Sequence, residues 1–312
     1  VNELFLFPPS LPKGAAKIRV LFFLLQIFLQ IFLLFPFFFC YFTQNQRENF
    51  HKNNAYICCS VSNNEIPCMQ KKILVVIPTY NEIENAEKIV RKVFSLEDGF
   101  HILIVDDGSP DGTAEVIRRL QPDFPGRLHM LERKGKLGLG TAYITGFKWG
   151  LENGYDYIIE MDADFSHNPD DLPRLYRACE LGADTSIGSR YCKGISVINW
   201  PIGRVIMSYY ASTFVRTVLG MPVYDCTAGF ICYRRKVLEA IALENIRMKG
   251  YGFQIEMKYN AYKLGFKVVE VPIIFVDRTE GTSKMSSGIF GEAFWGVIKM
   301  RFRKIRRGNQ NI

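Results

Sequence analysis

The sequence predicts an α/β fold with a mostly parallel sheet and helices on both of its faces. From Ile73 onward, short runs of β-branched residues alternate with longer amphipathic stretches. Strands that alternate with helices imply right-handed crossovers, so neighbouring strands are parallel and the sheet is covered on both sides. The chain has 312 residues, 48% of them hydrophobic, which is ample for a sizeable core.

The elements follow one another as strand, turn and helix. Pro78 ends the first strand, and Asn81 or Glu82 can cap the helix behind it. After the second strand, Asp111 or Thr113 can cap the next helix at the end of a glycine-rich turn. The expected strands are 73–77, 102–105, 128–131, 157–161 and 268–276, and the expected helices are 83–94, 113–120, 141–151 and 170–180.

Polar clusters stand at the carboxyl ends of the first two strands, where ligands bind in such sheets. They are PTYNE (78–82) and DDGSPDGT (106–113). Turns between strands and helices are usually polar, so either cluster alone has a structural explanation. Together, Glu82, Asp106 and Asp107 would repel one another unless a ligand donates hydrogen bonds to them, as ribose hydroxyls and a base N–H do. Neither GxGxxG nor GxxxxGK[ST] follows the first strand, which argues against a dinucleotide fold or a P-loop enzyme.

The segment EMDADFSH (160–167) follows the strand expected at 157–161. Asp162 and Asp164 can converge on one point, and oxygen ligands of this kind suit Mg²⁺ or Mn²⁺. An acid and base pair is disfavoured, because two carboxylates this close would share a proton unless a cation neutralised them. Helix capping is disfavoured because Asn168 and Pro169 already supply it. Ser166 could add a ligand, whereas His167 suits the surface or a supporting position.

Charge and cysteine content leave the partner open. The net charge of +8 suits an anionic partner such as a nucleotide, a phospholipid surface or a nucleic acid. The eight cysteines form no spaced pairs typical of a zinc site or a secreted disulfide frame. We expect the four beyond Met69 to be reduced core thiols.

The first 68 residues differ in composition from the rest of the chain. Residues 18–42 are almost unbroken apolar sequence behind Lys13, Lys17 and Arg19, and their length meets the roughly 20 residues that span a bilayer. A signal anchor or signal peptide is one interpretation. The favoured one is that 1–68 is upstream sequence translated from an incorrectly assigned start, because MQKKILVVIPTYNE resembles a natural beginning at Met69.

Four motifs carry a family resemblance: PTYNE, DDGSPDGT, DADFSHNP and GSRY stand in this order and at these spacings. They resemble family 2 glycosyltransferases of the GT-A fold. The nearest members are the dolichol-phosphate mannose synthases, or polyprenol-phosphate mannosyltransferases. The resemblance covers about 71–302 and implies one catalytic domain, which we place at 69–287. A basic, amphipathic C-terminal helix is expected at 288–312.

The resemblance implies a role for particular residues. Arg190 and Arg204 match the arginines that receive the acceptor's phosphate, and forked donors suit that task. Arg278 and Lys284 match a basic pair that meets the donor diphosphate on a closing loop. With Asp164, these four would be catalytic. The nucleotide sugar would be held by Pro78, Tyr80, Glu82, Ile104, Asp106, Asp162, Ala163, Asp164, Arg278 and Lys284.

Two further positions have more than one interpretation. Some members place a glutamine metal ligand where this chain has Ser166, which leaves the third protein ligand open. A metal set of Asp162, Asp164 and Ser166 is the expectation. Asp225, in DCTAGF, suits a role in holding either the sugar or the fold.

The activity implied is transfer of mannose from GDP-mannose to dolichyl or polyprenyl phosphate, with inversion and with Mg²⁺ or Mn²⁺. A phosphate monoester is largely dianionic at neutral pH, so no strong base is needed. UDP-glucose or another nucleotide sugar is the first alternative. A nucleotidyltransferase, for which PTYNE lacks the usual lysine-containing loop, and a non-catalytic membrane-associated binding module are others.

The acceptor would come from a membrane. We expect a cytoplasmic catalytic domain attached to a membrane surface, an attachment that a partner subunit could aid, and no nucleic-acid partner. The C-terminal stretch mixes aromatic and aliphatic residues with a basic end, which fits an interfacial helix and a core-packing helix equally.

Overall fold

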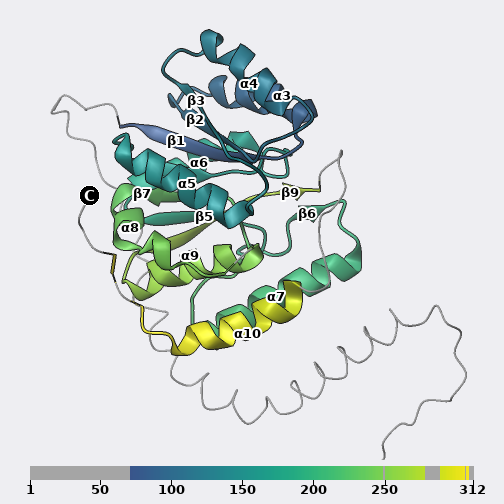
Figure 1. Ribbon diagram of the computed structural model, residues 1–312. Helices are drawn as coiled ribbons and strands as arrows, with labels where there is room; N and C mark the ends of the chain where they lie inside the picture. Colours follow the sequence, from purple (N-terminus) through teal and green to yellow (C-terminus); the bar gives the residue numbers. More distant parts are fainter. Residues whose placement is uncertain (1–70, 249, 278–288, 306, 309–312) are drawn as a thin grey trace, which may run out of the picture. The chain divides into compact units, whose positions relative to one another are not determined.

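The computed structural model describes residues 71–248, 250–277, 289–305 and 307–308 (Figure 1). Within them, seven strands form one sheet in the order β3-β2-β1-β4-β7-β5-β8. A separate parallel pair is formed by β6 (Val197–Ile198) and β9 (Phe275–Val276). The sheet strands are β1 (Ile73–Thr79), β2 (His101–Asp106), β3 (Leu128–Glu132), β4 (Tyr157–Glu160), β5 (Thr185–Ser189), β7 (Ile231–Arg234) and β8 (Val268–Pro272).

Helices cover both faces of the sheet, as predicted. One core joins the sheet to α3, α4 and α6, and the other joins it to α5, α7, α8, α9 and α10. Neighbouring residues of β1 point into different cores, since Val75 belongs to the first and Val76 to the second. The helices are α3 (Ile83–Phe94), α4 (Thr113–Leu120), α5 (Leu139–Glu152), α6 (Leu172–Glu180), α7 (Ile202–Leu219), α8 (Arg235–Ala240), α9 (Tyr251–Lys263) and α10 (Ile289–Phe302).

The sheet is mostly parallel, with one antiparallel strand. β3, β2, β1 and β4 are parallel neighbours, and β5 is parallel to β8. β7 runs antiparallel to both β4 and β5. Because β1, β2 and β4 run in one direction, the polar segments that follow them meet at one edge of the sheet.

One predicted strand is wrong. The run 268–276 is two strands, β8 and β9, that belong to different sheets. β8 pairs with β5, which ends at Ser189 opposite Pro272. The backbone N–H of Ile273 still donates to the carbonyl of Ser189 at 3.1 Å. The chain then leaves the central sheet, and Phe275 pairs with Val197 of β6. This change of partner carries the chain from the sheet to the start of α7.

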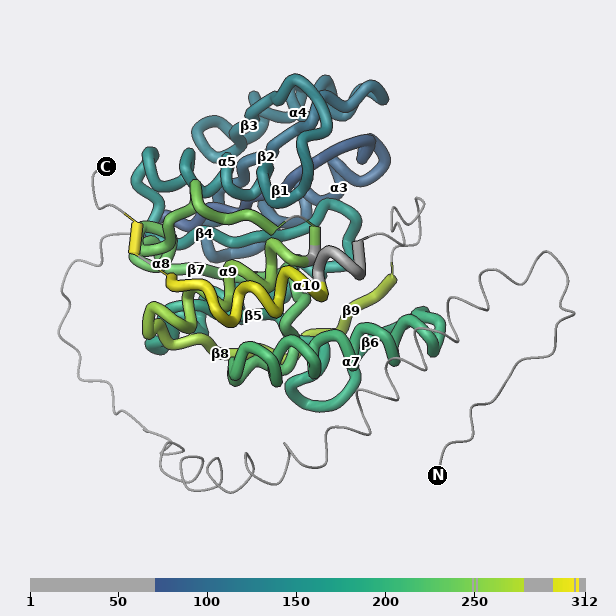
Figure 2. Tube along the Cα trace, turned by 60° about the horizontal axis from the view of Figure 1, so that its bottom comes forward, coloured from purple at the N-terminus to yellow at the C-terminus, as the bar shows by residue number. Residues whose placement is uncertain are grey.

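Helix α10 packs beside α7 and α9 (Figures 1 and 2). The ring of Phe294 stacks on Phe214 of α7 at 4.8 Å, and Arg303 pairs with the buried carboxylate of Glu256 in α9. Trp295 and Phe302 are 61% and 85% exposed. The helix therefore packs against the core on one side and leaves large aromatic side chains in solvent on another.

The described part of the chain contains no helix that combines the length and the hydrophobicity needed to cross a bilayer. The predicted segment 1–68 and the predicted boundary at residue 287 lie outside the described residues.

Candidate active site

The loops behind β1 and β2 are joined through Asp106. One carboxylate oxygen accepts from the hydroxyls of Thr79 (2.8 Å) and Ser109 (2.6 Å), and the other accepts from the backbone N–H of Ser109 (2.8 Å). The hydroxyl of Ser109 in turn accepts from the backbone N–H of Asn81 (3.0 Å). Asp106 is almost fully buried. The aspartate thus fixes the PTYNE segment to the DDGSPDGT segment.

The start of α3 is held by the second motif. The backbone N–H of Ile83 donates to Asp111 (3.1 Å), and that of Glu82 donates to the hydroxyl of Thr113 (3.1 Å). The predicted side-chain cap from Asn81 or Glu82 is wrong, because neither side chain caps α3. Asp111 also accepts from Thr113 at the first residue of α4. Burial opposes ionisation of Asp111, but these hydrogen bonds prevail and lower its pKa.

Asp107 forms a buried ion pair with Arg133, whose Nε donates to it at 2.6 Å. Arg133 also donates to the hydroxyl of Thr141 at 2.8 Å, close to the start of α5. The expectation that only a ligand could offset these acidic groups is therefore wrong for Asp106 and Asp107. Hydrogen bonds and an ion pair within the chain satisfy both carboxylates.

The other predicted nucleotide residues differ in exposure. Pro78, Tyr80 and Glu82 are partly exposed at the sheet edge, while the side chain of Ile104 lies in the core. The Nζ of Lys136 lies 4.9 Å from the centre of the Tyr80 ring. A cation thus lies beside the predicted nucleotide site, in a loop for which the sequence predicted no role. Direct contacts between these residues and a donor stay a prediction.

Asp162 and Asp164 follow β4 in a turn that other side chains support. The hydroxyl of Tyr143, in α5, donates to the carboxylate of Asp162 at 2.9 Å. Burial and then the Asp162 charge raise the pKa of Tyr143 well above its ordinary value, so this hydroxyl keeps its proton. The backbone N–H of Ser166 donates to Asp164 at 3.1 Å, across Phe165 in a left-handed conformation (φ 58°).

His167 supports the same turn from behind. Its Nδ1 accepts the backbone N–H of Asp162 at 3.1 Å, which leaves the ring proton on Nε2. The ring is buried, stacks on Phe230 at 4.9 Å and meets the edge of Phe275 at 5.9 Å. Of the two positions that the sequence allowed for His167, the structure therefore selects the supporting one.

The prediction that Asn168, and not Asp164, caps the helical segment after this turn is confirmed. The Asn168 side chain accepts from the backbone N–H of Asp170 at 3.1 Å. Pro169 opens a 3₁₀ turn, Pro169–Asp171, that leads into α6.

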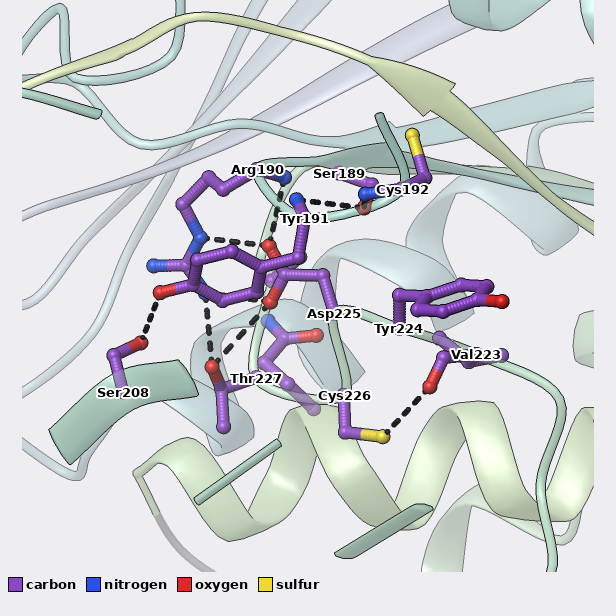
Figure 3. A network of polar contacts seen from close by, with 12 residues as sticks. Ser189, Arg190, Tyr191, Cys192, Ser208, Val223, Tyr224, Asp225, Cys226 and Thr227 are labelled. Atoms are coloured by element: carbon purple, nitrogen blue, oxygen red, sulfur yellow. Dashed lines mark hydrogen bonds and ion pairs between the residues drawn. The ribbon is translucent and has the colours of Figure 1, made fainter. Parts of the chain in front are cut away.

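Arg190 is locked to Asp225 (Figure 3). Its Nε and Nη2 donate to the two carboxylate oxygens at 2.7 and 2.6 Å, and its backbone N–H adds a bond of 2.9 Å. The side chains are 8% and 0% exposed. Burial opposes ionisation of Asp225, but Arg190 prevails and lowers its pKa. The Nε and Nη2 atoms of Arg190 are thus bound to Asp225 in this structure, and a contact of Arg190 with an acceptor phosphate stays a prediction.

Arg204 lies near Arg190 in a more open pair. Its Nη1 donates to Asp277 at 2.8 Å, and these side chains are 27% and 23% exposed. The guanidinium carbons of Arg204 and Arg190 lie 4.1 and 5.4 Å from the ring centre of Trp200. The structure thus brings the two predicted acceptor arginines together. Arg278 and Lys284 lie outside the described residues.

Comparison with known proteins identifies the family of this chain. The family model described as glycosyl transferase family 2 matches residues 74–242. The chain belongs to this family. It is 48% identical over 233 residues to a polyprenol monophosphomannose synthase of Mycolicibacterium smegmatis, covering 75% of this chain and 88% of the relative. It is 46% identical over 228 residues to an undecaprenyl-phosphate mannosyltransferase of Micrococcus luteus, covering 73% and 93%.

Solved structures confirm the GT-A fold of this glycosyltransferase. A glucosyl-3-phosphoglycerate synthase from Mycobacterium tuberculosis, in complex with Mn²⁺, UDP-glucose and phosphoglyceric acid, aligns with a TM-score of 0.55 at 18% identity, covering 75% of this chain and 81% of that one. The same enzyme in complex with Mg²⁺ and UDP also aligns at 0.55 and 18%, covering 75% and 80%.

The DADFS turn of this glycosyltransferase fits a hard divalent cation in its donor atoms. Asp162 and Asp164 offer carboxylate oxygens, which Mg²⁺ and Mn²⁺ prefer, and both side chains are partly exposed. No group of three or more His, Cys, Asp or Glu side chains suited to a metal occurs among the described residues. A Mg²⁺ site commonly takes one or two protein carboxylates together with substrate phosphates, and the two aspartates suit such a site. Ser166 as a third ligand stays a prediction.

Three residues at the site of this glycosyltransferase have no predicted role from the sequence. Tyr143 belongs to a helix whose pattern indicates core packing. Trp200 stands four residues before Arg204, a spacing that carries no signal outside a helix. Lys136 lies in the glycine-rich run GKLGLG, which could have been noticed as a loop before a helix.

Proposed function

We propose that this glycosyltransferase transfers a mannosyl residue from GDP-mannose to dolichyl or polyprenyl phosphate, with inversion, to give polyprenyl-phosphate mannose. The observation that carries the proposal is the identity of 46–48% to two curated relatives named for polyprenol-phosphate or undecaprenyl-phosphate mannosylation. The chain spans 88% and 93% of those relatives, so the site-bearing domain is matched nearly whole.

The donor would lie along the edge formed by β1, β2 and β4. Tyr80 and Glu82 follow β1, in the middle of this edge, and Asp162 and Asp164 follow the neighbouring strand β4. Mg²⁺ or Mn²⁺ held by the two aspartates would stabilise the charge on the departing nucleotide diphosphate. Tyr143 and His167 orient Asp162, which favours a fixed arrangement of the carboxylates before the donor binds.

The acceptor phosphate would bind at Arg204 beside Arg190. The Arg204–Asp277 pair is partly exposed, so an incoming phosphate can displace the carboxylate or share the Arg204 guanidinium with it. A dianionic phosphate oxygen is already a nucleophile, and the two guanidinium groups would chiefly place it and screen its charge from the donor. No side chain is needed as a strong base.

A membrane surface is the expected source of the lipid. Arg204 shares the first turns of α7 with Ile202, Ile206 and Met207, all of which are exposed. On α10, exposed Trp295 is followed by the basic residues of the last turn, and aromatic and basic groups together favour a lipid interface. We place the catalytic domain on the cytoplasmic side, with a partner subunit as an additional means of attachment.

The test is transfer of label from radiolabelled GDP-mannose to polyprenyl phosphate by the purified protein. The expected product is extractable into organic solvent and labile to mild acid, and EDTA or Asp164→Ala abolishes its formation. Asp170→Ala is the matched control, because Asp170 is an exposed aspartate of the next turn. Full activity of Asp164→Ala would reject the metal assignment. A parallel screen that includes UDP-glucose decides the donor, and label transferred from UDP-glucose alone would overturn GDP-mannose.

A further inference from the structure

Trp200 lies against both arginines of the acceptor site. The guanidinium carbon of Arg204 is 4.1 Å from the indole ring centre, and that of Arg190 is 5.4 Å away. Guanidinium groups at such distances are attracted to the negative face of an indole. We infer that Trp200 is a positioning residue that holds Arg204 beside Arg190 for the phosphate of the acceptor. This inference rests on the proposed function.

Ring packing and backbone hydrogen bonds hold the indole of Trp200 in place. Phe275 of β9 meets it at 5.3 Å with an angle of 68° between the rings. The pairing of β6 with β9 and the backbone N–H of Asp277, which donates to Ile198 at 3.1 Å, fix the segments on both sides. Asn199, with φ 63°, turns the chain between β6 and Trp200. The ring thus stands on a short two-stranded pair rather than on a loose surface loop.

The two arginines need this support to different degrees. Arg190 is buried and bound to Asp225 through both oxygens of the carboxylate. Arg204 makes one described hydrogen bond to Asp277, in a pair that is partly exposed, and such pairs restrain side chains weakly. The flat face of the indole restricts the plane of the Arg204 guanidinium whether Asp277 or a phosphate occupies its edge. Trp200 therefore sets where Arg204 lies relative to Arg190.

The rings that pack around Trp200 extend to the DADFS turn, which carries Asp162 and Asp164. Phe275 meets His167 at 5.9 Å, and His167 accepts the backbone N–H of Asp162. The acceptor arginines and the donor carboxylates are thus tied to one set of packed rings. A phosphate placed by the arginines would then have a fixed position relative to the donor, which lowers the entropic cost of reaction.

The experiment compares Trp200→Leu and Trp200→Phe with the wild-type chain. Binding of geranyl phosphate, a short soluble prenyl phosphate, is measured by calorimetry without donor, and KM for polyprenyl phosphate and kcat are measured separately. We expect Trp200→Leu to weaken geranyl phosphate binding about tenfold and Trp200→Phe about two- to threefold, because a benzene ring attracts a cation less than an indole does. Affinity for GDP-mannose should not change.

Trp149→Leu is the control for loss of a tryptophan elsewhere, since Trp149 packs on His129 and Tyr155; its affinity for geranyl phosphate should equal that of the wild type. Equal affinity of Trp200→Leu and wild type would overturn the inference, and so would a parallel loss of GDP-mannose binding, which indicates general disruption. If Trp200→Leu fails to fold, the Phe variant decides by the same comparison. A wild-type chain that binds no prenyl phosphate would instead reject the proposed function.

Discussion

Two arginine–aspartate pairs in this protein differ in burial and in the number of hydrogen bonds that join them, so Asp225→Asn and Asp277→Asn can be compared. In the first pair the side chains of Arg190 and Asp225 are 8% and 0% exposed. In the second, those of Arg204 and Asp277 are 27% and 23% exposed. Each substitution removes one negative charge and keeps the shape of the side chain.

The expected loss of unfolding free energy in each variant depends on how deeply the remaining arginine is buried. Asp225→Asn leaves a buried guanidinium without its counter-charge, and breaking such a pair costs about 3–5 kcal/mol. Asp277→Asn breaks a partly solvated pair, for which about 1 kcal/mol or less is expected. Against a total stability of about 5–15 kcal/mol, the first change is severe and the second is minor.

A second buried cation makes the effect of Asp225→Asn depend on pH. The Nζ of Lys258 is buried and donates to the carbonyl of Cys226 at 3.0 Å. Burial lowers the pKa of Lys258 to about 8, and the charge of Asp225 opposes this shift. A lysine whose native pKa lies below its unfolded value binds fewer protons when folded, so stability rises with pH between the two values. Without Asp225 the native pKa falls further, and that rise begins at lower pH.

The assay is urea unfolding followed by circular dichroism, near pH 7 and again near about pH 9, where a lysine of lowered pKa is largely neutral. Asp225→Asn should lose several times more unfolding free energy than Asp277→Asn near neutrality, and part of that loss should return at the higher pH. Equal losses in the two variants would refute the assignment of Arg190–Asp225 as the buried structural pair.

Three further predictions concern other parts of the chain. Tyr143→Phe removes the hydroxyl that orients Asp162, so Mn²⁺ affinity, followed by electron paramagnetic resonance, should fall about tenfold. In Gly146→Ala, the new methyl group would overlap a methyl of Val76 in β1, so the free energy of unfolding should fall by about 1–3 kcal/mol. Gly203→Ala on α7 is the control, because its methyl group would meet no atom within 4 Å, and the free energy of unfolding should not change. Burial lowers the pKa of His101, so stability should decline as pH falls below about 6.5, and His101→Gln should reduce that decline.

The first half of the fold was predictable because its signals are local. Strong periodicity gave the helices 83–94 and 113–120 with the bounds that the structure has. Strands β5, β6 and β7 escaped prediction. β5, with the sequence TSIGS, lacks a β-branched run, and β7 lies between β4 and β5, which precede it in the chain. That antiparallel insertion depends on long-range pairing, which no local pattern encodes.

The site divides in the same way. The DADFS turn and the cap at Asn168 are contiguous in sequence, and local geometry sufficed to interpret them. The partner of Arg190 lies 35 positions away, and the tyrosine that supports Asp162 lies 19 away on a helix that otherwise packs the core. Sequence patterns identified the charged groups, but which charges neutralise one another is decided by the tertiary fold.

The hydrogen bonds between the loops behind β1 and β2 have a consequence for protein engineering. Asp106, Ser109 and Asp111 form the hydrogen bonds that hold the PTYNE segment and the start of α3 in place. The two loops therefore behave as one exchangeable unit. A chimera that takes only the first loop from a relative with another nucleotide preference would meet mismatched partners in the second. We therefore predict that altering donor choice at the proposed nucleotide site requires both loops to be transplanted together.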